Sequence, residues 1–266
     1  MRNIRMAGMA FSIIVFLGLS LPAAETTNVQ MAAIKFQSTQ ARTALLELYT
    51  SEGCSSCPPA EAWLSRLQDS PRLWRDFTPV AFHVDYWNYL GWKDAWSDAT
   101  FSERQHVFAQ LWRSENIYTP EFVLNGKEWG NWSTGKDGPQ ADGEKVGVLT
   151  VTSTDAVHWQ ASYMPEKANS APCEINAALL AGGIVSEVKA GENKGRRLNH
   201  DFVVVNFAQF GMAASDGVAK GKFILDAPRY NSEKTLALAV WITQPGELVP
   251  LQATGGWLTP PAVDKR

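Results

Sequence analysis

The sequence of 266 residues predicts an α/β domain followed by a small antiparallel β-domain. Three observations support this prediction. The first is a Cys-x-x-Cys pair, Cys54 and Cys57, which follows a β-type apolar run and opens a helical pattern. The second is a polar, Gly-rich stretch, and the third is a series of short alternating apolar runs after it. We therefore divide the chain into an α/β domain at 43–132, a linker or exposed loop at 133–145 and a β-rich, sandwich-like domain at 146–260.

The N-terminus has the order of a secretory signal peptide. Two arginines precede an apolar stretch from Met6 to Leu21, and small residues follow it. We expect residues 1–24 to be removed on export to the periplasm or the medium; an uncleaved anchor is the alternative. Removal of Arg2 and Arg5 changes the formal net charge from −3 to −5, which argues against a nucleic-acid partner. The stretch is shorter than the ~20 residues of a membrane span, so we expect none after removal.

The first predicted domain contains two strand–helix units and a hairpin. Residues 43–49 form a nearly continuous apolar run, typical of a strand buried on both faces. Apolar residues recur at helical spacing from Pro58, and the prolines stand in the first turn, which tolerates them. A second strand is predicted at 79–87, a second helix at 98–116, and a hairpin at the Asn-Gly turn 125–126. This order matches the thioredoxin fold.

The pattern changes after the predicted linker. Turn residues separate short alternating runs, and no long helical pattern intervenes, which predicts antiparallel β-structure. The runs are 146–151, 157–163, 173–180, 184–188, 202–207, 222–225, 236–242 and 248–251. The third cysteine, Cys173, lies in one of them, and we expect a buried, apolar free thiol; a resolving thiol is the alternative.

The cysteine pair is the candidate catalytic site. Export would place it in an oxidising compartment, where disulfides persist. The thiolate is the nucleophile of thiol–disulfide exchange, and a helix N-terminus stabilises its negative charge. We expect exchange with thiols or disulfides of exported proteins or peptides, with Cys54 attacking and Cys57 resolving. The alternatives are a noncatalytic binding module with a structural disulfide and a copper-handling dithiol. We expect no resident cofactor or metal.

Two further segments could assist the pair. A cis Thr119-Pro120 bond would face the cysteines, so that the backbone of Thr119 pairs with an extended partner; an ordinary trans bond is the alternative. Glu47 lies in the buried strand seven positions before Cys54. Its carboxylate could take the proton of Cys57, or it could be paired with a Lys or Arg.

The second predicted strand and the loop after it add four candidates. His83 and Asp85 alternate and so share one face of the strand. They could tune the thiols, bind a metal with the cysteines, or form a satisfied core pair. Trp92 and Trp96 belong to an aromatic-rich loop, a candidate groove for a hydrophobic peptide or ligand; aromatic core packing is the alternative.

Several long motifs, in one order from about Ala44 to Trp257, resemble a secreted thioredoxin-like family catalogued as domain of unknown function 1223. The motifs are ELYTSEGCSSCPPAE at 47–61, FHVDYWNYLGWKD at 82–94, YTP at 118–120 with NG at 125–126, and GENKGRRLNH at 191–200. The resemblance implies a thioredoxin-like fold and an exported protein. It carries the cysteine motif onto Cys54 and Cys57 and the proline motif onto Pro120, and it implies no established activity. We find no chemical role for 191–200, and His200 stays outside the catalytic set.

Overall fold

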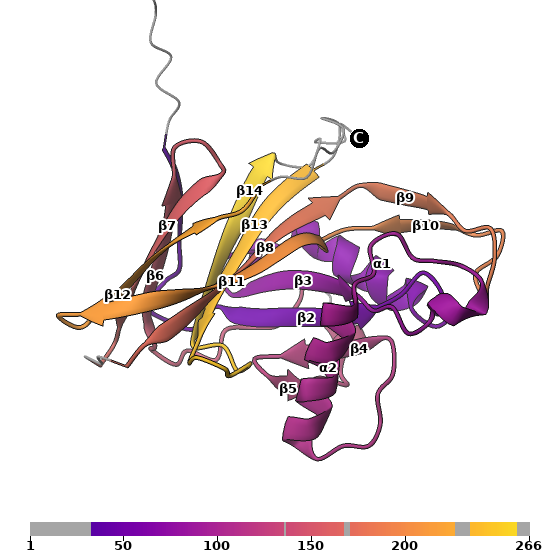
Figure 1. Ribbon diagram of the computed structural model, residues 1–266, viewed down its shortest axis with the longest axis horizontal. Coiled ribbons are helices and arrows are strands. Elements are labelled where there is room, and N and C mark those ends of the chain that lie inside the picture. The colour runs from indigo at the N-terminus through magenta and orange to yellow at the C-terminus, as the bar shows by residue number, and fades with distance from the viewer. Residues whose placement is uncertain (1–32, 136, 168–170, 227–234, 260–266) are drawn as a thin grey trace, which may run out of the picture. The chain divides into compact units, whose positions relative to one another are not determined.

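The computed structural model describes residues 33–135, 137–167, 171–226 and 235–259. The expected signal peptide at 1–24 lies outside the described residues. Residues 32–266 form one compact unit. Its described part contains two α-helices, α1 (Pro58–Arg66) and α2 (Ala99–Trp112), neither of which is long and apolar enough to cross a membrane (Figure 1). Three short 3-10 helices lie at Leu67–Asp69, Asn88–Leu90 and Trp132–Thr134.

The described residues also form fourteen β-strands. They are β1 (Ile34–Gln37), β2 (Ala44–Thr50), β3 (Phe77–His83), β4 (Glu121–Leu124), β5 (Lys127–Glu128), β6 (Gly147–Ser153), β7 (His158–Pro165), β8 (Cys173–Gly182), β9 (Ile184–Glu187), β10 (Arg197–His200), β11 (Val203–Ser215), β12 (Val218–Ile224), β13 (Thr235–Thr243) and β14 (Gln252–Thr259). Most of the apolar runs expected from the sequence coincide with one of these strands. The run at 248–251 precedes β14 instead.

Twelve of the described strands belong to one mixed sheet. The order along it is β1-β6-β7-β12-β11-β3-β2-β4-β5, and β8, β13 and β14 branch from β11 through β8. Strand β2 pairs in parallel with β3 and antiparallel with β4. Strands β9 and β10 form a separate antiparallel pair.

The predicted fold class, an α/β thioredoxin-like domain followed by a small antiparallel β-domain, is wrong. The strands on both sides of 133–145 share one sheet, because β11 pairs in parallel with β3 at Val203 and Ala81 and antiparallel with β8. The Ala81 amide also donates a hydrogen bond to the Phe202 carbonyl at 2.8 Å. Backbone from the C-terminal half therefore covers the edge of β3. Strands, not helices, make up most of the structure.

The two helices cover opposite faces of β2, which is buried along its whole length. Side chains alternate along a strand, so Glu47 and Thr50 point to opposite faces. Glu47 contacts Arg104 of α2, and Thr50 contacts Glu61 of α1. This arrangement places one face of the sheet behind the cysteine pair and the other beneath α2.

The hairpin predicted at Asn125–Gly126 is confirmed and joins β4 to β5. Both turn residues have positive φ, 50° and 78°, the conformation that a tight hairpin turn requires and that Asn and Gly adopt most readily. The Asn125 side chain accepts a hydrogen bond from the Leu45 amide at 2.9 Å, which ties the turn to β2. The hairpin follows directly after Thr119 and Pro120, and so positions them.

Candidate functional site

The cysteine pair forms a disulfide between β2 and α1. Cys57 is the N-cap residue of α1, whose first two residues are Pro58 and Pro59. The Cα atoms of the two cysteines are 5.5 Å apart, and the Cys57 amide donates to the Cys54 carbonyl at 3.3 Å. Cys54 is 1% and Cys57 0% exposed. The disulfide thus closes a buried turn that begins the helix.

Thr119 lies directly against this turn. The Thr119–Pro120 bond is cis, as expected. The Thr119 carbonyl oxygen is 3.6 Å from Cys54 Sγ and accepts a hydrogen bond from the exposed Ser56 hydroxyl at 3.3 Å. On its other side, Trp87 Nε1 donates to the Thr119 hydroxyl at 2.8 Å. The structure therefore brings the predicted cysteine and proline motifs together.

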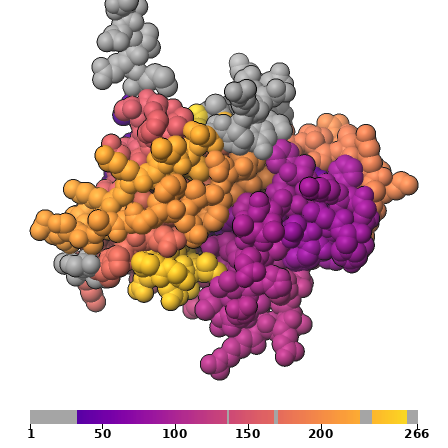
Figure 2. Space-filling view, viewed as in Figure 1, coloured from indigo at the N-terminus to yellow at the C-terminus, as the bar shows by residue number. Residues whose placement is uncertain are grey.

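The segment 191–200 covers the cysteine turn. Glu192 accepts a hydrogen bond from the Ser55 amide at 3.0 Å. Asn193, which is 0% exposed, donates to the carbonyls of Glu52 and Cys54, both at 2.9 Å. Figure 2 shows the orange segment that contains β9 and β10 lying against the purple part of the chain. A motif without a role in the sequence analysis therefore fixes the backbone of the disulfide turn.

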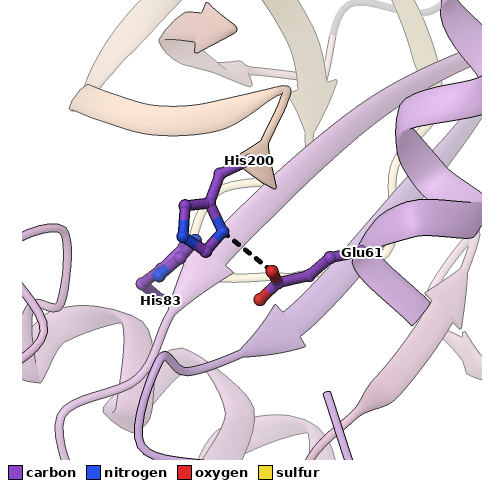
Figure 3. A group of neighbouring side chains, drawn as sticks. All are labelled: Glu61, His83 and His200. Carbon is purple, nitrogen blue, oxygen red and sulfur yellow. Dashed lines mark hydrogen bonds and ion pairs between the residues drawn. The ribbon is translucent and has the colours of Figure 1, made fainter. Parts of the chain in front are cut away.

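A buried group of imidazoles and carboxylates adjoins the turn; we call Glu52, Glu61, His83, Asp94 and His200 the imidazole–carboxylate cluster. His83 Nδ1 is 2.7 Å from Asp94 Oδ2. His200 Nδ1 is 2.8 Å from Glu61 Oε2, and its Nε2 is 3.2 Å from Glu52 Oε1. The two imidazole rings meet edge to face with centroids 5.2 Å apart (Figure 3). All five residues are at most 6% exposed.

Each carboxylate of the cluster has a further hydrogen-bond donor. Thr50 donates to Glu61 Oε1 at 2.5 Å, and Trp92 Nε1 donates to Glu52 Oε2 at 2.6 Å. Backbone amides of Glu52 and Trp96 donate to Asp94 at 2.8 and 2.9 Å. These donors fix the orientation of the carboxylates.

The imidazoles and carboxylates of the cluster stabilise each other's charged forms. Burial alone lowers the pKa of His200, but its contacts with Glu52 and Glu61 outweigh this effect and raise that pKa to about 10. Burial tends to raise the pKa values of Glu61 and Asp94, yet interactions with His200 and His83 hold them below the ordinary value. His200 is therefore an imidazolium between two carboxylates at neutral pH.

Glu47 lies away from the cysteine side of the sheet. Arg104 donates to its two oxygens at 2.7 and 3.2 Å, and the Tyr49 hydroxyl donates at 3.0 Å. This is the ion-paired arrangement that the sequence left as the alternative to a proton acceptor. Glu47 is 0% exposed, so the guanidinium of Arg104 provides the charge that compensates it.

The other four candidate residues, His83, Asp85, Trp92 and Trp96, do not form one group. Strand β3 ends at His83, so Asp85 turns away and accepts a hydrogen bond from Ser102 at 2.5 Å. Trp92 and Trp96 are half-buried beside the imidazole–carboxylate cluster, where the first holds Glu52 and the second packs near Ile184. The side chains of His83 and Trp92 form hydrogen bonds within the cluster.

Sequence reasoning missed most of this cluster. Glu61 stands beside Ala60, Trp63 and Leu64 on the apolar face of the predicted helix, and a carboxylate in such a stripe was a usable signal. Glu52 and Asp94 lie in loops, where exposure is the ordinary expectation. The Glu52 backbone is held by Asn193, which lies 141 positions later.

The fold and site define a mostly β protein in which a buried disulfide begins a helix beside an imidazole–carboxylate cluster. The chain belongs to the family described as Protein of unknown function (DUF1223), whose model matches residues 45–243, which confirms the family predicted from the motifs. A search of curated proteins finds no match.

Two solved structures resemble the chain. A crystal structure of an Agrobacterium tumefaciens protein is 21% identical, with a TM-score of 0.58, over 85% of this chain and 98% of that one. HBP35 of Porphyromonas gingivalis is 10% identical, with a TM-score of 0.51, over 86% of this chain and 80% of that one. Both likenesses concern the fold alone.

Proposed function

We propose that the protein exchanges its Cys54–Cys57 disulfide with thiols of exported proteins or peptides in the periplasm or the medium. The observation that carries the proposal is the position of the disulfide at the start of α1, with the Thr119 carbonyl beside Cys54 Sγ. A helix N-terminus stabilises a thiolate. The Thr119 carbonyl beside the sulfur can accept a hydrogen bond from the backbone of a partner chain.

The exchange has two steps that balance. A partner thiolate attacks Cys54 Sγ, the bond between the cysteines breaks, and the electron pair leaves on Cys57 Sγ as a thiolate. A second partner thiolate then attacks the partner sulfur of the mixed disulfide and releases Cys54. The partner loses two electrons and becomes a disulfide, and the cysteine pair gains them as two thiols. The reverse sequence reduces a partner disulfide.

The route to Cys54 passes over exposed residues. Ser55 and Ser56 separate the cysteines and are exposed, although the sulfurs beneath are not. The Ser56 hydroxyl donates a hydrogen bond to the Thr119 carbonyl at 3.3 Å. A backbone amide of an extended partner would replace this hydroxyl and bring the partner sulfur over Cys54.

Trapping tests the proposal. In a Cys173→Ser background, Cys57→Ala leaves Cys54 alone, and we expect it to form a stable mixed disulfide with a cysteine-containing peptide disulfide. The matched variant Cys54→Ala should form far less adduct, because its remaining thiol is 0% exposed and the Thr119 carbonyl that would bind the partner lies beside position 54. A reduction potential below about −300 mV, together with no adduct from either variant, would refute exchange.

The burial of both sulfurs favours one second candidate, a binding module with a structural disulfide. Closing so short a loop stabilises the folded state by about 2 kcal/mol in the chain-entropy treatment. Under this function, reduction would lower the free energy of unfolding by that amount, and no variant would trap a partner.

A further inference from the structure

Three buried atoms of the imidazole–carboxylate cluster have no hydrogen-bond partner among the described residues: Glu52 Oε1, His83 Nε2 and His200 Nε2. The first and third lie 3.2 Å apart as an ion pair, without the alignment of a hydrogen bond. Buried polar atoms are nearly always hydrogen-bonded, so His83 Nε2, which has neither a hydrogen bond nor an ion pair among the described residues, requires an explanation.

Each of the two imidazoles has a carboxylate on one ring nitrogen. Asp94 contacts His83 Nδ1, and Glu52 lies 3.2 Å from His200 Nε2. Metal-binding histidines show this arrangement, with a carboxylate on one ring nitrogen and the metal on the other. The cluster therefore has the outer partners of a metal site as well as its inner donors.

The possible ligand atoms lie close enough together to bind one metal ion. One ligand atom from each of Glu61, His83 and His200 lies within 4.8 Å of the other two (Figure 3). In a zinc tetrahedron with bonds of about 2.05 Å the ligand atoms are roughly 3.4 Å apart, so side-chain movements of about 1 Å close the site.

The charge of the cluster also favours a cation. Three carboxylates face two imidazoles, so the group is negative even when both imidazoles are protonated. A bound dication neutralises two of the three charges while the imidazoles are neutral.

We propose that Glu61, His83 and His200 bind a zinc ion, with the fourth position of the ion open. Two imidazoles with carboxylates suit Zn²⁺, whereas Mg²⁺ and Ca²⁺ take oxygen ligands. The ion takes the place of the proton between His200 Nδ1 and Glu61, since a metal-bound imidazole is neutral. A pocket of about 340 Å³ between α1 and β10 reaches Glu61, and Arg196 and Asn199 are among the other residues that line it.

Zinc titration of the purified, chelator-treated protein tests the site. In competition with a chromogenic chelator we expect one Zn²⁺ per chain, and no competition by Mg²⁺ in excess. His83→Ala should weaken zinc binding at least about 100-fold, and Asp94→Asn about 10- to 100-fold, the range for outer partners. The matched control is His106→Ala, which changes an exposed histidine on α2 and should bind zinc like the parent. Absence of stoichiometric binding, or equal binding by His83→Ala, would overturn the proposal.

X-ray absorption at the zinc edge gives a test that needs no variant. The proposed ligands predict nitrogen and oxygen neighbours at about 2.0–2.2 Å, whereas thiolate ligands lie at about 2.3 Å. Sulfur neighbours would overturn the proposal and assign the metal to the cysteines.

The zinc site does not depend on thiol–disulfide exchange, and the two can fail separately. Cys54→Ser/Cys57→Ser removes the exchange chemistry and leaves all three proposed ligands. We expect this variant to bind one Zn²⁺ with the parent affinity. Loss of zinc binding in it would contradict the site at Glu61, His83 and His200, whatever the outcome of the trapping experiments.

Discussion

Arg104 offers a sharp test of the packing that holds α2 on the sheet. Its guanidinium is buried and donates to both oxygens of Glu47 at 2.7 and 3.2 Å. It also lies 5.4 to 5.6 Å from the ring centroids of Phe82, Phe108 and Trp241. Arg104→Met keeps an unbranched side chain among these rings but removes the charge.

The expected loss follows from the carboxylate left behind. Glu47 is 0% exposed, and Tyr49 would be its remaining side-chain donor. Removal of one partner of a buried ion pair costs about 3–5 kcal/mol, because the other charge stays buried and uncompensated. At 2–4 °C per kcal/mol for a domain of this size, the melting temperature should fall by about 6–20 °C.

Urea unfolding followed by tryptophan fluorescence measures the effect, with Arg104→Met, Glu47→Gln and the double variant compared with the parent. The double variant removes both charges, so it should be more stable than the sum of the single changes predicts, with a coupling energy of about 1–3 kcal/mol. The slope of the free energy against urea should be the same in all four proteins.

Two outcomes would refute this reasoning. One is an Arg104→Met variant within about 0.5 kcal/mol of the parent, the range of ordinary surface substitutions. The other is a coupling energy near zero, which would mean that the pair contributes through packing and not through charge.

Three other substitutions test other parts of the structure. Burial raises the pKa of Glu121 to about 7, so the folded state holds the carboxyl proton more tightly than the unfolded state. The stability gained from this protonation is complete below about pH 4.5 and is lost as the pH rises through 7. Glu121→Gln should remove that part of the pH profile of the urea midpoint, and parallel profiles would contradict it. Asn193→Ala removes the side-chain donor of the Glu52 carbonyl and one of two donors of the Cys54 carbonyl, and it should cost about 1–3 kcal/mol in urea unfolding. An unchanged midpoint would show that these hydrogen bonds do not stabilise the disulfide turn. In Gly255→Ala the new Cβ would lie 2.5 Å from the Leu238 carbonyl, and we expect a cost of about 1–3 kcal/mol, whereas Gly211→Ala, with no atom within 4 Å, should match the parent.

Local elements were predictable because their signals are local. The apolar run before Cys54, the prolines that open α1 and the Asn125–Gly126 turn each determine the backbone within a few residues. The cysteine turn and the cis bond at Thr119 followed from the same kind of reasoning. The cysteine turn and Thr119 lie close together because of the hairpin at Asn125–Gly126, which the sequence also predicted.

The sheet and the cluster were not predictable in this way. Periodicity shows that 202–207 is a strand, but it does not show that Val203 pairs with Ala81, more than 100 residues earlier. The partner of Glu47 is likewise on a helix 57 residues later, and the helical pattern around Arg104 gives no sign of it. Side-chain partners at such separations are fixed by the tertiary structure and not by any local pattern.

The hydrogen bonds of Asn193 affect the order in which parts of the structure can form as the chain is synthesised. Cys54 and Cys57 can pair as soon as their own turn exists, since only three positions separate them. The side chain that holds the Cys54 carbonyl lies 139 positions later, and the strand that covers the edge of β3 follows it. A chain that has emerged only through residue 145 therefore presents its disulfide turn and a sheet edge to water. The cysteines are shielded only when the last third of the protein arrives.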